Sequence, residues 1–391
     1  MKKTIKLIIL LIIIMLQIYL VSVQPINVRV ANKYDDQLMI EQAASILEGK
    51  WLGEYNCLTL IKGPITPLFI ALSNILHIPF LIAQDIFYIL ACLLLVYELR
   101  KLVKNDIVQI LIFTILIFNP IIYSSELCRI YRDGIYLALI IYLIAFSMGV
   151  FLNRKDKISK LIFRYIGLGI TVGAVCLCRE EVIWIIPYIV IGIIITIINI
   201  LIDKEEKYKK KKLLLFLISI MIILLMINIV KILNYKYYGI FELNQYWGKE
   251  FKEAYGALTR IIPEENIKKV PVTSDMLEKA YKVSPKFAEL KEYFEKETFN
   301  WAMCGDGIST EIQGGWFHWA LMRAVESKGY YKDAKTANEY YQQVADEINE
   351  ACDNGEIKAL KYKRKSNVNR FDCEDIYESI KKMRRCNEIS I

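Results

Sequence analysis

Residues 7–21 read LIILLIIIMLQIYLV, an almost unbroken apolar run that follows Lys2, Lys3 and Lys6. A cleaved signal peptide would end in a small-residue cleavage site, and residues 21–25 at the end of this run, Val-Ser-Val-Gln-Pro, supply a poor one. We therefore expect this run to remain as a first membrane span. With a mean hydropathy of +0.32 and a formal charge of +8 over 391 residues, the chain is neither an ordinary soluble domain nor a disordered tail.

Six further apolar runs are each long enough, at about 1.5 Å per residue, to cross a hydrocarbon core of about 30 Å. They occupy residues 81–99, 107–123, 135–152, 161–178, 182–202 and 213–233. Residues 65–80 are also apolar, so counting this stretch as a span gives about eight crossings and leaving it out gives about seven.

Positive charge decides between these counts, because the cytoplasmic loops of membrane proteins are enriched in lysine and arginine. Basic clusters lie at residues 2–6, 100–104, 154–160 and 204–212. All four clusters face the cytoplasm if residues 65–80 do not cross, whereas three of the four would lie outside if they do. The prolines of this stretch also suit a bent, half-buried segment better than a straight span.

We therefore expect an all-α integral protein of the cytoplasmic membrane, with about seven transmembrane helices and a cytoplasmic N-terminus. Residues 1–233 would form the transmembrane module, whose first outer loop, residues 24–80, carries juxtamembrane helices. Residues 234–391 turn polar and would form a small α-rich domain on the extracytoplasmic side.

Helix-start signals recur in the C-terminal region. Ser284 is the expected N-cap of a helix over residues 285–299, with a favoured proline in its first turn. Thr336 and Glu339 have the spacing of a capping box at the start of another helix. Residues 353–355, Asp-Asn-Gly, would end that second helix because they tolerate a left-handed turn.

Two groups of side chains in this region leave alternatives open. Trp316 and Trp319 would either stack on sugar rings or pack a small helical core. Four cysteines allow three disulfide pairings, and free thiols are the alternative. They are Cys304, Cys352, Cys373 and Cys386. The chain has only two histidines and no Cys/His ligand spacing, so a zinc site is not expected.

Asp35 and Asp36 lie between the first span and residues 38–47, which have the pattern of a short amphipathic helix at the membrane surface. One aspartate would cap this helix, and Asp36, which is nearer to it, is the expected cap. A cap does not need two carboxylates, which repel each other unless one is protonated or the pair binds a cation. The other hypothesis is a general base or a metal-binding acid, with Asp35 as the expected base.

The second outward loop carries Glu126, Arg129, Arg132 and Asp133 between two apolar spans. Charges in this position are costly unless they are paired or used. Mutual salt bridges are one explanation. The other is that the arginines bind the phosphate of an anionic lipid through two parallel hydrogen bonds.

Further charges are expected on the same face. Arg179 and the two following glutamates join two spans with almost no loop, and Lys62 closes the first outer loop. Acids that accept a proton and bases that bind phosphate suit the transfer of a sugar from a lipid-linked phosphosugar. We therefore select Lys62, Arg129, Arg132 and Arg179 as candidate phosphate-binding residues.

The order of these parts resembles the GT-C superfamily of membrane glycosyltransferases, which includes protein O-mannosyltransferases and lipid A aminoarabinose transferases. The resemblance covers residues 1–233. It consists of one span, a large outer loop with acids near its start, and a proline-containing entry segment at residues 62–72, KGPITPLFIAL. A span ending in Arg100-Lys101-Leu102 and an arginine–acid loop at Arg132-Asp133 follow.

This resemblance implies an inverting glycosyltransferase that uses a polyprenyl-phosphate sugar and a glycan, lipid or protein acceptor. It implies that Asp35 or Asp36 is the base and that Glu126 or Asp133 is the second-loop acid. Some members of the superfamily hold a divalent cation with such acids and others need none, so a divalent cation is a possible cofactor. No nucleic-acid partner is expected. The C-terminal region resembles no catalytic module.

Two other classes of protein remain as alternatives. A lipid-linked glycan flippase or transporter would carry ionisable residues along a path through its spans, whereas these span interiors are nearly pure Ile, Leu and Val, with Asp85 near one end. It would also be expected to show an internal repeat, and none is evident. The other alternative is a membrane-anchored scaffold without catalysis. In such a protein the charged residues at the span junctions would only cap helices and form salt bridges.

Overall fold

The computed structural model describes residues 3–28, 34–204, 208–305 and 310–361. Within these ranges the chain is all-helical, and its only β-type pairing is a single bridge between Ile261 and Ala359. The chain divides into two compact units, one of Met1–Glu54 and Leu58–Asn244 and the other of Tyr55–Cys57 and Gln245–Ile391.

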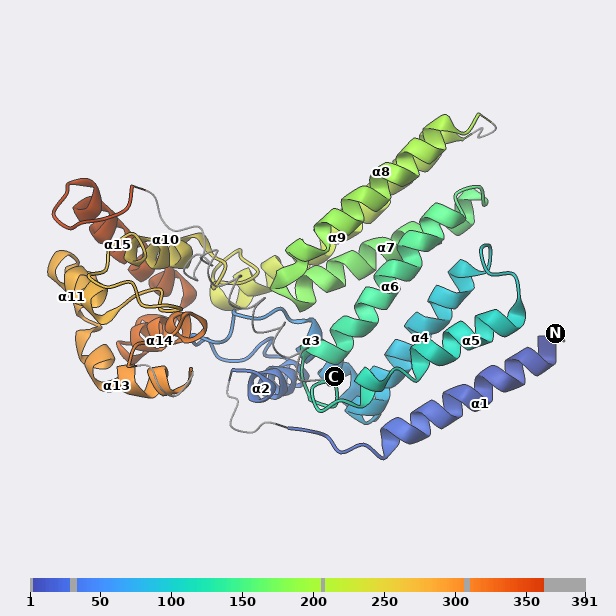
Figure 1. Ribbon diagram of the computed structural model, residues 1–391, viewed down its shortest axis with the longest axis horizontal. Helices are drawn as coiled ribbons and strands as arrows, with labels where there is room; N and C mark the ends of the chain where they lie inside the picture. Colours follow the sequence, from blue (N-terminus) through green and yellow to red (C-terminus); the bar gives the residue numbers. More distant parts are fainter. Residues whose placement is uncertain (1–2, 29–33, 205–207, 306–309, 362–391) are drawn as a thin grey trace, which may run out of the picture. The chain divides into compact units, whose positions relative to one another are not determined.

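Seven helices in the described ranges are long and apolar enough to cross a membrane, as the sequence predicts (Figure 1). They are α1 (Lys3–Ser22), α4 (Phe80–Leu99), α5 (Asp106–Ile117) followed by η1 (Pro120–Tyr123), α6 (Arg132–Leu152), α7 (Ile158–Cys178), α8 (Ile186–Ile202) preceded by η2 (Glu180–Trp184), and α9 (Lys209–Tyr238). The chain is therefore a multi-pass membrane protein. Helix α9 continues past residue 233 to Tyr238, and the two units divide between Asn244 and Gln245.

The ambiguous stretch 65–80 does not form a span. It folds as α3 (Ile65–Ile75), an apolar helix of 11 residues, which is too short to cross a bilayer. His77 follows with a left-handed backbone, and Pro79 precedes the first residue of α4. The first outer loop also contains α2 (Asp36–Leu47), the expected short helix.

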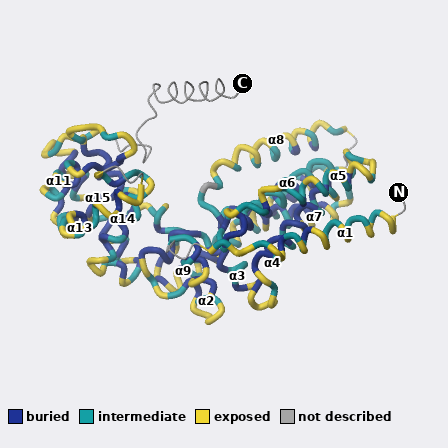
Figure 2. The backbone as a smooth tube through the Cα atoms, turned by 60° about the horizontal axis from the view of Figure 1, so that its bottom comes forward, coloured by how far each residue is buried: buried dark blue, intermediate teal, exposed yellow. Residues whose placement is uncertain are grey.

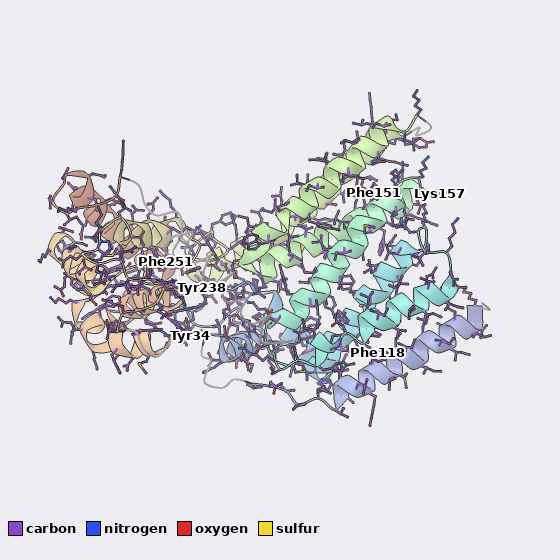
Figure 3. All side chains as sticks on the ribbon, viewed as in Figure 1. Tyr34, Phe118, Phe151, Lys157, Tyr238 and Phe251 are labelled. Atoms are coloured by element: carbon purple, nitrogen blue, oxygen red, sulfur yellow. The ribbon has the colours of Figure 1, made fainter. Side chains whose placement is uncertain are left out.

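Helices α4, α6 and α7 form the centre of the bundle: α4 packs on α6, and α7 packs on both α6 and α9. Helices α1 and α8 keep most of their apolar surface exposed (Figure 2). Side chains fill the space between the helices, and Phe118 after α5 lies toward the opposite end of the bundle from Lys157 before α7 (Figure 3). Small residues allow close packing, since a Cβ on Gly169 of α7 would lie 2.9 Å from the Ser219 backbone of α9.

The second unit contains α10 (Lys249–Leu258), α11 (Ser274–Val283), α12 (Pro285–Ala288), α13 (Lys291–Met303), α14 (Gly314–Ser327), η3 (Tyr330–Lys332) and α15 (Ala334–Asp353). Ser284 caps α12 as predicted, by accepting a hydrogen bond from the Phe287 amide. The expected helix over 285–299 is wrong in extent, because α12 ends at Ala288 and α13 is a separate helix.

The capping box predicted at Thr336 is also wrong. Helix α15 begins earlier, and its N-cap is Asp333, whose carboxylate accepts hydrogen bonds from both the amide and the hydroxyl of Thr336. Two favourable caps stand close together there, and the charged one is used. The predicted stop at residues 353–355 is confirmed, since α15 ends at Asp353 and Gly355 has a positive φ.

The tryptophans and cysteines of this unit can be placed in part. Trp316 and Trp319 are both half-buried, and the fully buried residue between them is Phe317. Cys304 is exposed and Cys352 buried, and neither forms a disulfide in the part of the chain that the structure describes. Cys373 and Cys386 lie outside the described residues.

A buried ion pair joins α4 to α7 at the end of the bundle that carries the basic clusters. The Nε of Arg164 donates to both carboxylate oxygens of Glu98 at 2.9 Å, and Asn153 donates to the same carboxylate at 2.6 Å. The carboxylate fits beside α6 because residue 149 is glycine, where a Cβ would lie 2.8 Å from Glu98 Cδ. All of these polar groups are withdrawn from solvent.

We predict that Arg164→Met destabilises the protein by about 3–5 kcal/mol, because it leaves the Glu98 carboxylate buried without a counter-charge. The double variant Glu98→Gln, Arg164→Met should recover most of this loss. The measurement is unfolding in mixed detergent micelles. Lys155→Met, at an exposed ion pair near the same end, is the control and should cost no more than about 1 kcal/mol. Equal losses for Arg164→Met and Lys155→Met would contradict the prediction.

Candidate functional site

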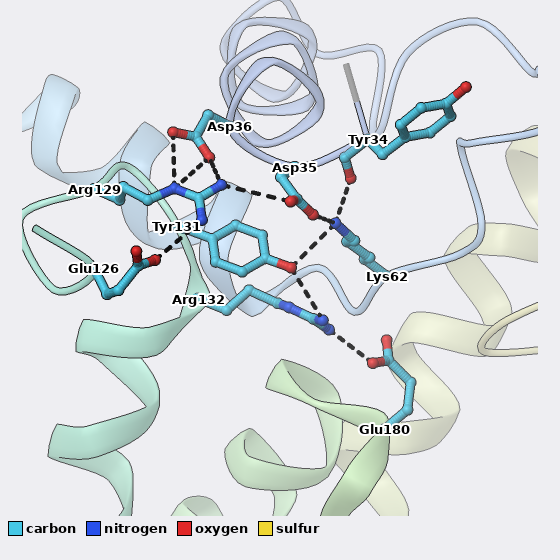
Figure 4. A network of polar contacts seen from close by, with 9 residues as sticks. All are labelled: Tyr34, Asp35, Asp36, Lys62, Glu126, Arg129, Tyr131, Arg132 and Glu180. Atoms are coloured by element: carbon cyan, nitrogen blue, oxygen red, sulfur yellow. Dashed lines mark hydrogen bonds and ion pairs between the residues drawn. The ribbon is translucent and has the colours of Figure 1, made fainter. Parts of the chain in front are cut away.

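Four segments of the first unit meet in one network of polar contacts (Figure 4). They are the start of α2, the residues before α3, the segment leading into α6, and the start of η2 (Glu180–Trp184). The nine residues drawn are Tyr34, Asp35, Asp36, Lys62, Glu126, Arg129, Tyr131, Arg132 and Glu180. Arg132 begins α6 and Arg154 follows its last turn, so this network and the basic clusters lie at opposite ends of α6.

Asp36 and Arg129 form the most deeply buried part of the network. The Nε of Arg129 donates to the two carboxylate oxygens at 2.9 and 3.1 Å, and its Nη2 also donates to Oδ1. Asp36 has no exposed surface. Burial alone would lower the pKa of Arg129, but its hydrogen bonds to Asp36 and the charge of that carboxylate raise it above its usual value. Arg129 therefore stays charged.

Neither aspartate side chain caps α2, so the expectation that Asp36 is the cap is wrong. The N-cap position belongs to Asp35, and its side chain makes no capping hydrogen bond. The Asp36 carboxylate is directed to Arg129 instead. A full ion pair with two parallel hydrogen bonds satisfies a buried carboxylate better than a single backbone amide can.

Asp35 is the more accessible of the two acids, with 31% of its side chain exposed. The Nζ of Lys62, which is nearly fully buried, donates to Asp35 Oδ1 and to the Tyr34 carbonyl. Burial acts to raise the pKa of Asp35, but Lys62 and, to a lesser extent, Tyr131 and Arg129 outweigh it, so the pKa is lowered. Asp35 is therefore an ionised carboxylate within reach of solvent.

Burial has the opposite effect on the lysine. It lowers the pKa of Lys62 to about 8, although the neighbouring Asp35 carboxylate acts to raise it. Gly63 brings this lysine close to the end of α7, because a Cβ at residue 63 would stand 1.9 Å from the carbonyl oxygen of Leu177. Only glycine allows this approach.

Tyr131 lies at the centre of the network. Its hydroxyl accepts hydrogen bonds from Lys62 at 3.2 Å and from Arg132 at 3.3 Å. The three cations also lie near its ring, with Lys62 Nζ at 4.9 Å, Arg129 Cζ at 4.7 Å and Arg132 Cζ at 5.4 Å from the centroid. Burial raises the pKa of Tyr131 to about 12, so the hydroxyl is neutral at physiological pH.

Two reciprocal ion pairs join the first turn of α6 to the residues after α7. Arg132 donates to Glu180 at 2.7 Å, and Arg179 donates to Asp133 at 2.5 Å. The second pair is about one-quarter exposed, whereas Arg132 is nearly fully buried. The Nε of Arg132 is also buried and has no hydrogen-bond partner among the described residues. A buried donor of this kind is normally satisfied.

Six of the residues selected from the sequence meet in this network, and Asp133 and Arg179 form the adjoining pair. The six are Asp35, Asp36, Lys62, Glu126, Arg129 and Arg132. Tyr131 and Glu180 also belong to the network and were not among the residues predicted from the sequence. The position of Tyr131 between two candidate arginines was the available signal for it, and Glu180 directly follows Arg179.

The carboxylates of this site are directed at basic side chains, which is not the arrangement of a divalent-cation site. Across the described ranges, no group of three or more His, Cys, Asp or Glu residues is arranged to hold a metal ion. Metal binding therefore plays no part in the mechanism proposed below.

Comparison with known proteins gives no match to this chain, whether with family models, curated proteins or solved structures. The function must therefore be inferred from the residues and geometry of the site.

We predict that Asp36→Asn destabilises the protein by about 3–5 kcal/mol, because it leaves the Arg129 charge buried without its partner. The neighbouring Asp35→Asn should cost less, about 1–2 kcal/mol, because Asp35 is partly exposed and the buried Lys62, whose pKa is already lowered to about 8, can release its proton when the carboxylate is removed. Both variants are compared with the wild type by unfolding in detergent micelles. Similar losses for the two substitutions would show that the pair is not divided into a buried and an accessible acid.

Proposed function

We propose that the protein is an inverting glycosyltransferase that moves a sugar from a polyprenyl-phosphate donor to an acceptor at the outer face of the cytoplasmic membrane. One observation carries the proposal: a partly exposed, ionised Asp35 contacts the buried cations Lys62 and Arg129, and the Tyr131 hydroxyl joins Lys62 to Arg132. A base for an acceptor hydroxyl and positive charge for a phosphate leaving group are the two requirements of such a transfer.

The proposed reaction is a direct displacement at the anomeric carbon. Asp35 accepts the proton of the acceptor hydroxyl while the acceptor oxygen forms a bond to that carbon. The bond from the anomeric carbon to the phosphate oxygen breaks, and its electron pair leaves with the polyprenyl phosphate. Attack from the side opposite the phosphate inverts the configuration. Asp36 does not serve as the base, because its carboxylate is fully buried against Arg129.

The cations of the site are suited to the leaving phosphate. Lys62 and Arg132 both contact the Tyr131 hydroxyl, so their charges are held near one point. The unpartnered Nε of Arg132 offers a hydrogen bond that no protein group takes up among the described residues. An arginine can add a second, parallel hydrogen bond to phosphate if Glu180 gives way to it.

The location of the site supports an outward-facing reaction. Residues 100–104 and 154–160 are basic and lie at the opposite ends of α4 and α6 from the polar network. Basic loops favour the cytoplasmic side, which supports a position of the network at the outer surface of the cytoplasmic membrane. The second unit would then also be extracytoplasmic, where it could recognise a glycan, lipid or protein acceptor.

We predict that Asp35→Asn lowers glycan transfer at least about a hundredfold, because the reaction loses its general base. The measurement is mass spectrometry of surface glycans in host cells that lack the gene and are complemented with each variant. Asp106→Asn is the matched control: it also removes an aspartate from a lysine pair, its side chain is 33% exposed, and it should restore modification fully.

Full modification by Asp35→Asn at normal membrane abundance would refute this assignment of the base. Purified protein in liposomes separates the transferase from a flippase. Movement of a lipid-linked sugar across the bilayer without transfer to any acceptor would favour the flippase.

We further predict that binding of a free polyprenyl phosphate falls as the pH rises through about 8. Lys62 loses its proton there and the site loses one positive charge. A phosphate monoester has its second pKa near about 6, so measurements from about pH 7 to about pH 10 leave the charge of the ligand constant. Binding to protein in nanodiscs is measured against the uncharged polyprenol. Lys62→Arg should move the fall to higher pH, and the same fall in both proteins would exclude Lys62 as its cause.

A further inference from the structure

A second polar cluster lies inside the bundle and has no role in the proposed transfer. The Tyr123 hydroxyl donates to Gln17 Oε1 at 2.6 Å, and Gln17 Nε2 donates to Asp85 Oδ1 at 2.9 Å. These residues come from η1, α1 and α4. Gln17 and Asp85 are both nearly fully buried. The chain of donors ends at Asp85, whose second carboxylate oxygen is buried and has no partner in the described structure.

Asp85 and Gln84 both line one small cavity of about 20 Å³, together with Tyr88, Cys128 and Gly134 among others. Gln84 Nε2 donates to the Leu127 carbonyl at 2.9 Å, which leaves its Oε1 as an acceptor. That oxygen is also buried without a partner among the described residues. A volume above about 10–15 Å³ is enough for one water molecule or one small ion.

The space for this arrangement depends on a glycine. A Cβ on Gly134 would stand 2.2 Å from the Gln84 amide. Gln84 and Asp85 therefore line a cavity that is bounded by α6 and the segment before it, and both side chains are buried. The two oxygens without partners are both acceptors, and the Tyr88 hydroxyl and the Cys128 thiol donate to backbone carbonyls, so an occupant must bring a donor or a positive charge.

The structure supplies no counter-charge for Asp85. The titratable groups near it are Tyr88 and Cys92 on α4, Tyr123 on η1 and Cys128 beside the cavity, and none of these is a cation. No lysine or arginine contacts Asp85 within the described ranges. A lone ionised carboxylate inside an apolar bundle is costly, so a positive charge must come from outside the chain.

We propose that this cavity binds one positive charge at Asp85, as a proton or as a single Na⁺ ion. In the first case a proton from solvent sits on Asp85 Oδ2 and is shared, directly or through one water, with Gln84 Oε1. In the second case both oxygens bind the ion, which prefers oxygen ligands as other hard cations do. The site does not depend on glycosyl transfer. Leu127 and Cys128 line it and lie between Glu126 and Arg129 in the chain.

The test is thermal unfolding of the full chain in detergent micelles, with NaCl compared with an equal concentration of choline chloride from about pH 5 to about pH 9. Binding of Na⁺ should raise the Tm of the wild type in NaCl by at least about 2 °C at the alkaline end, where protons no longer compete. Binding of a proton should give no difference between the salts. The wild type should then lose Tm relative to Asp85→Asn as the pH rises, because its folded state holds the extra proton.

Asp85→Asn should give the same Tm in the two salts and should lack the extra loss of Tm with rising pH, and Asp106→Asn should keep whichever response the wild type shows. Infrared spectroscopy of the wild type provides a second measurement if Asp85→Asn does not fold. A protonated carboxyl band that persists above the normal aspartate range supports the proton. The absence of that band, together with identical Tm values in the two salts, overturns the proposal. So does an Asp85→Asn protein with the salt and pH responses of the wild type.

Discussion

The ion pair between Asp36 and Arg129 is the interaction on which the rest of the polar network depends. Two charges withdrawn from water are stable only when they satisfy each other, so this pair holds the start of α2 against the segment before α6. With α2 held there, the carboxylate of the preceding residue, Asp35, accepts a hydrogen bond from Lys62 and does not cap the N-terminus of α2. Neighbouring residues of one type thus divide two tasks, one maintaining the fold and the other remaining reachable.

Polar pairs also decide how the apolar helices are arranged. Lipid tails are as apolar as leucine side chains. The apolar surface of a helix therefore gives it little preference for one neighbouring helix over another. Here α7 is tied to α4 through Arg164 and Glu98 at one end. At the other end the residues that follow it, Arg179 and Glu180, are tied to the first turn of α6. The helix at the centre of the bundle is therefore specified at both of its ends.

Hydropathy and charge were sufficient to predict the seven spans and the short α3, because crossing a bilayer depends on local length and composition. They also predicted that the candidate acids and bases lie at one end of the bundle. They did not predict which acid meets which base, since Asp36 and Arg129 lie 93 positions apart and Tyr131 gathers cations from separate segments. The prediction of the N-cap of α15 was wrong for a local reason. Asp333 and Thr336 are both good N-cap residues, and only packing selects one of them.

The contact between Gly63 and the Leu177 carbonyl has a consequence for how this protein can vary. The last turn of α7 sets the position of the Lys62 backbone, and Glu180 follows that turn directly. Each residue rotates a helix by about 100°, so one insertion or deletion within the 21 residues of α7 would swing this carbonyl to another face. Substitutions along the lipid-facing side of α7 leave this registration intact. The exposed positions of α7 can therefore vary in composition, whereas the length of the helix is fixed.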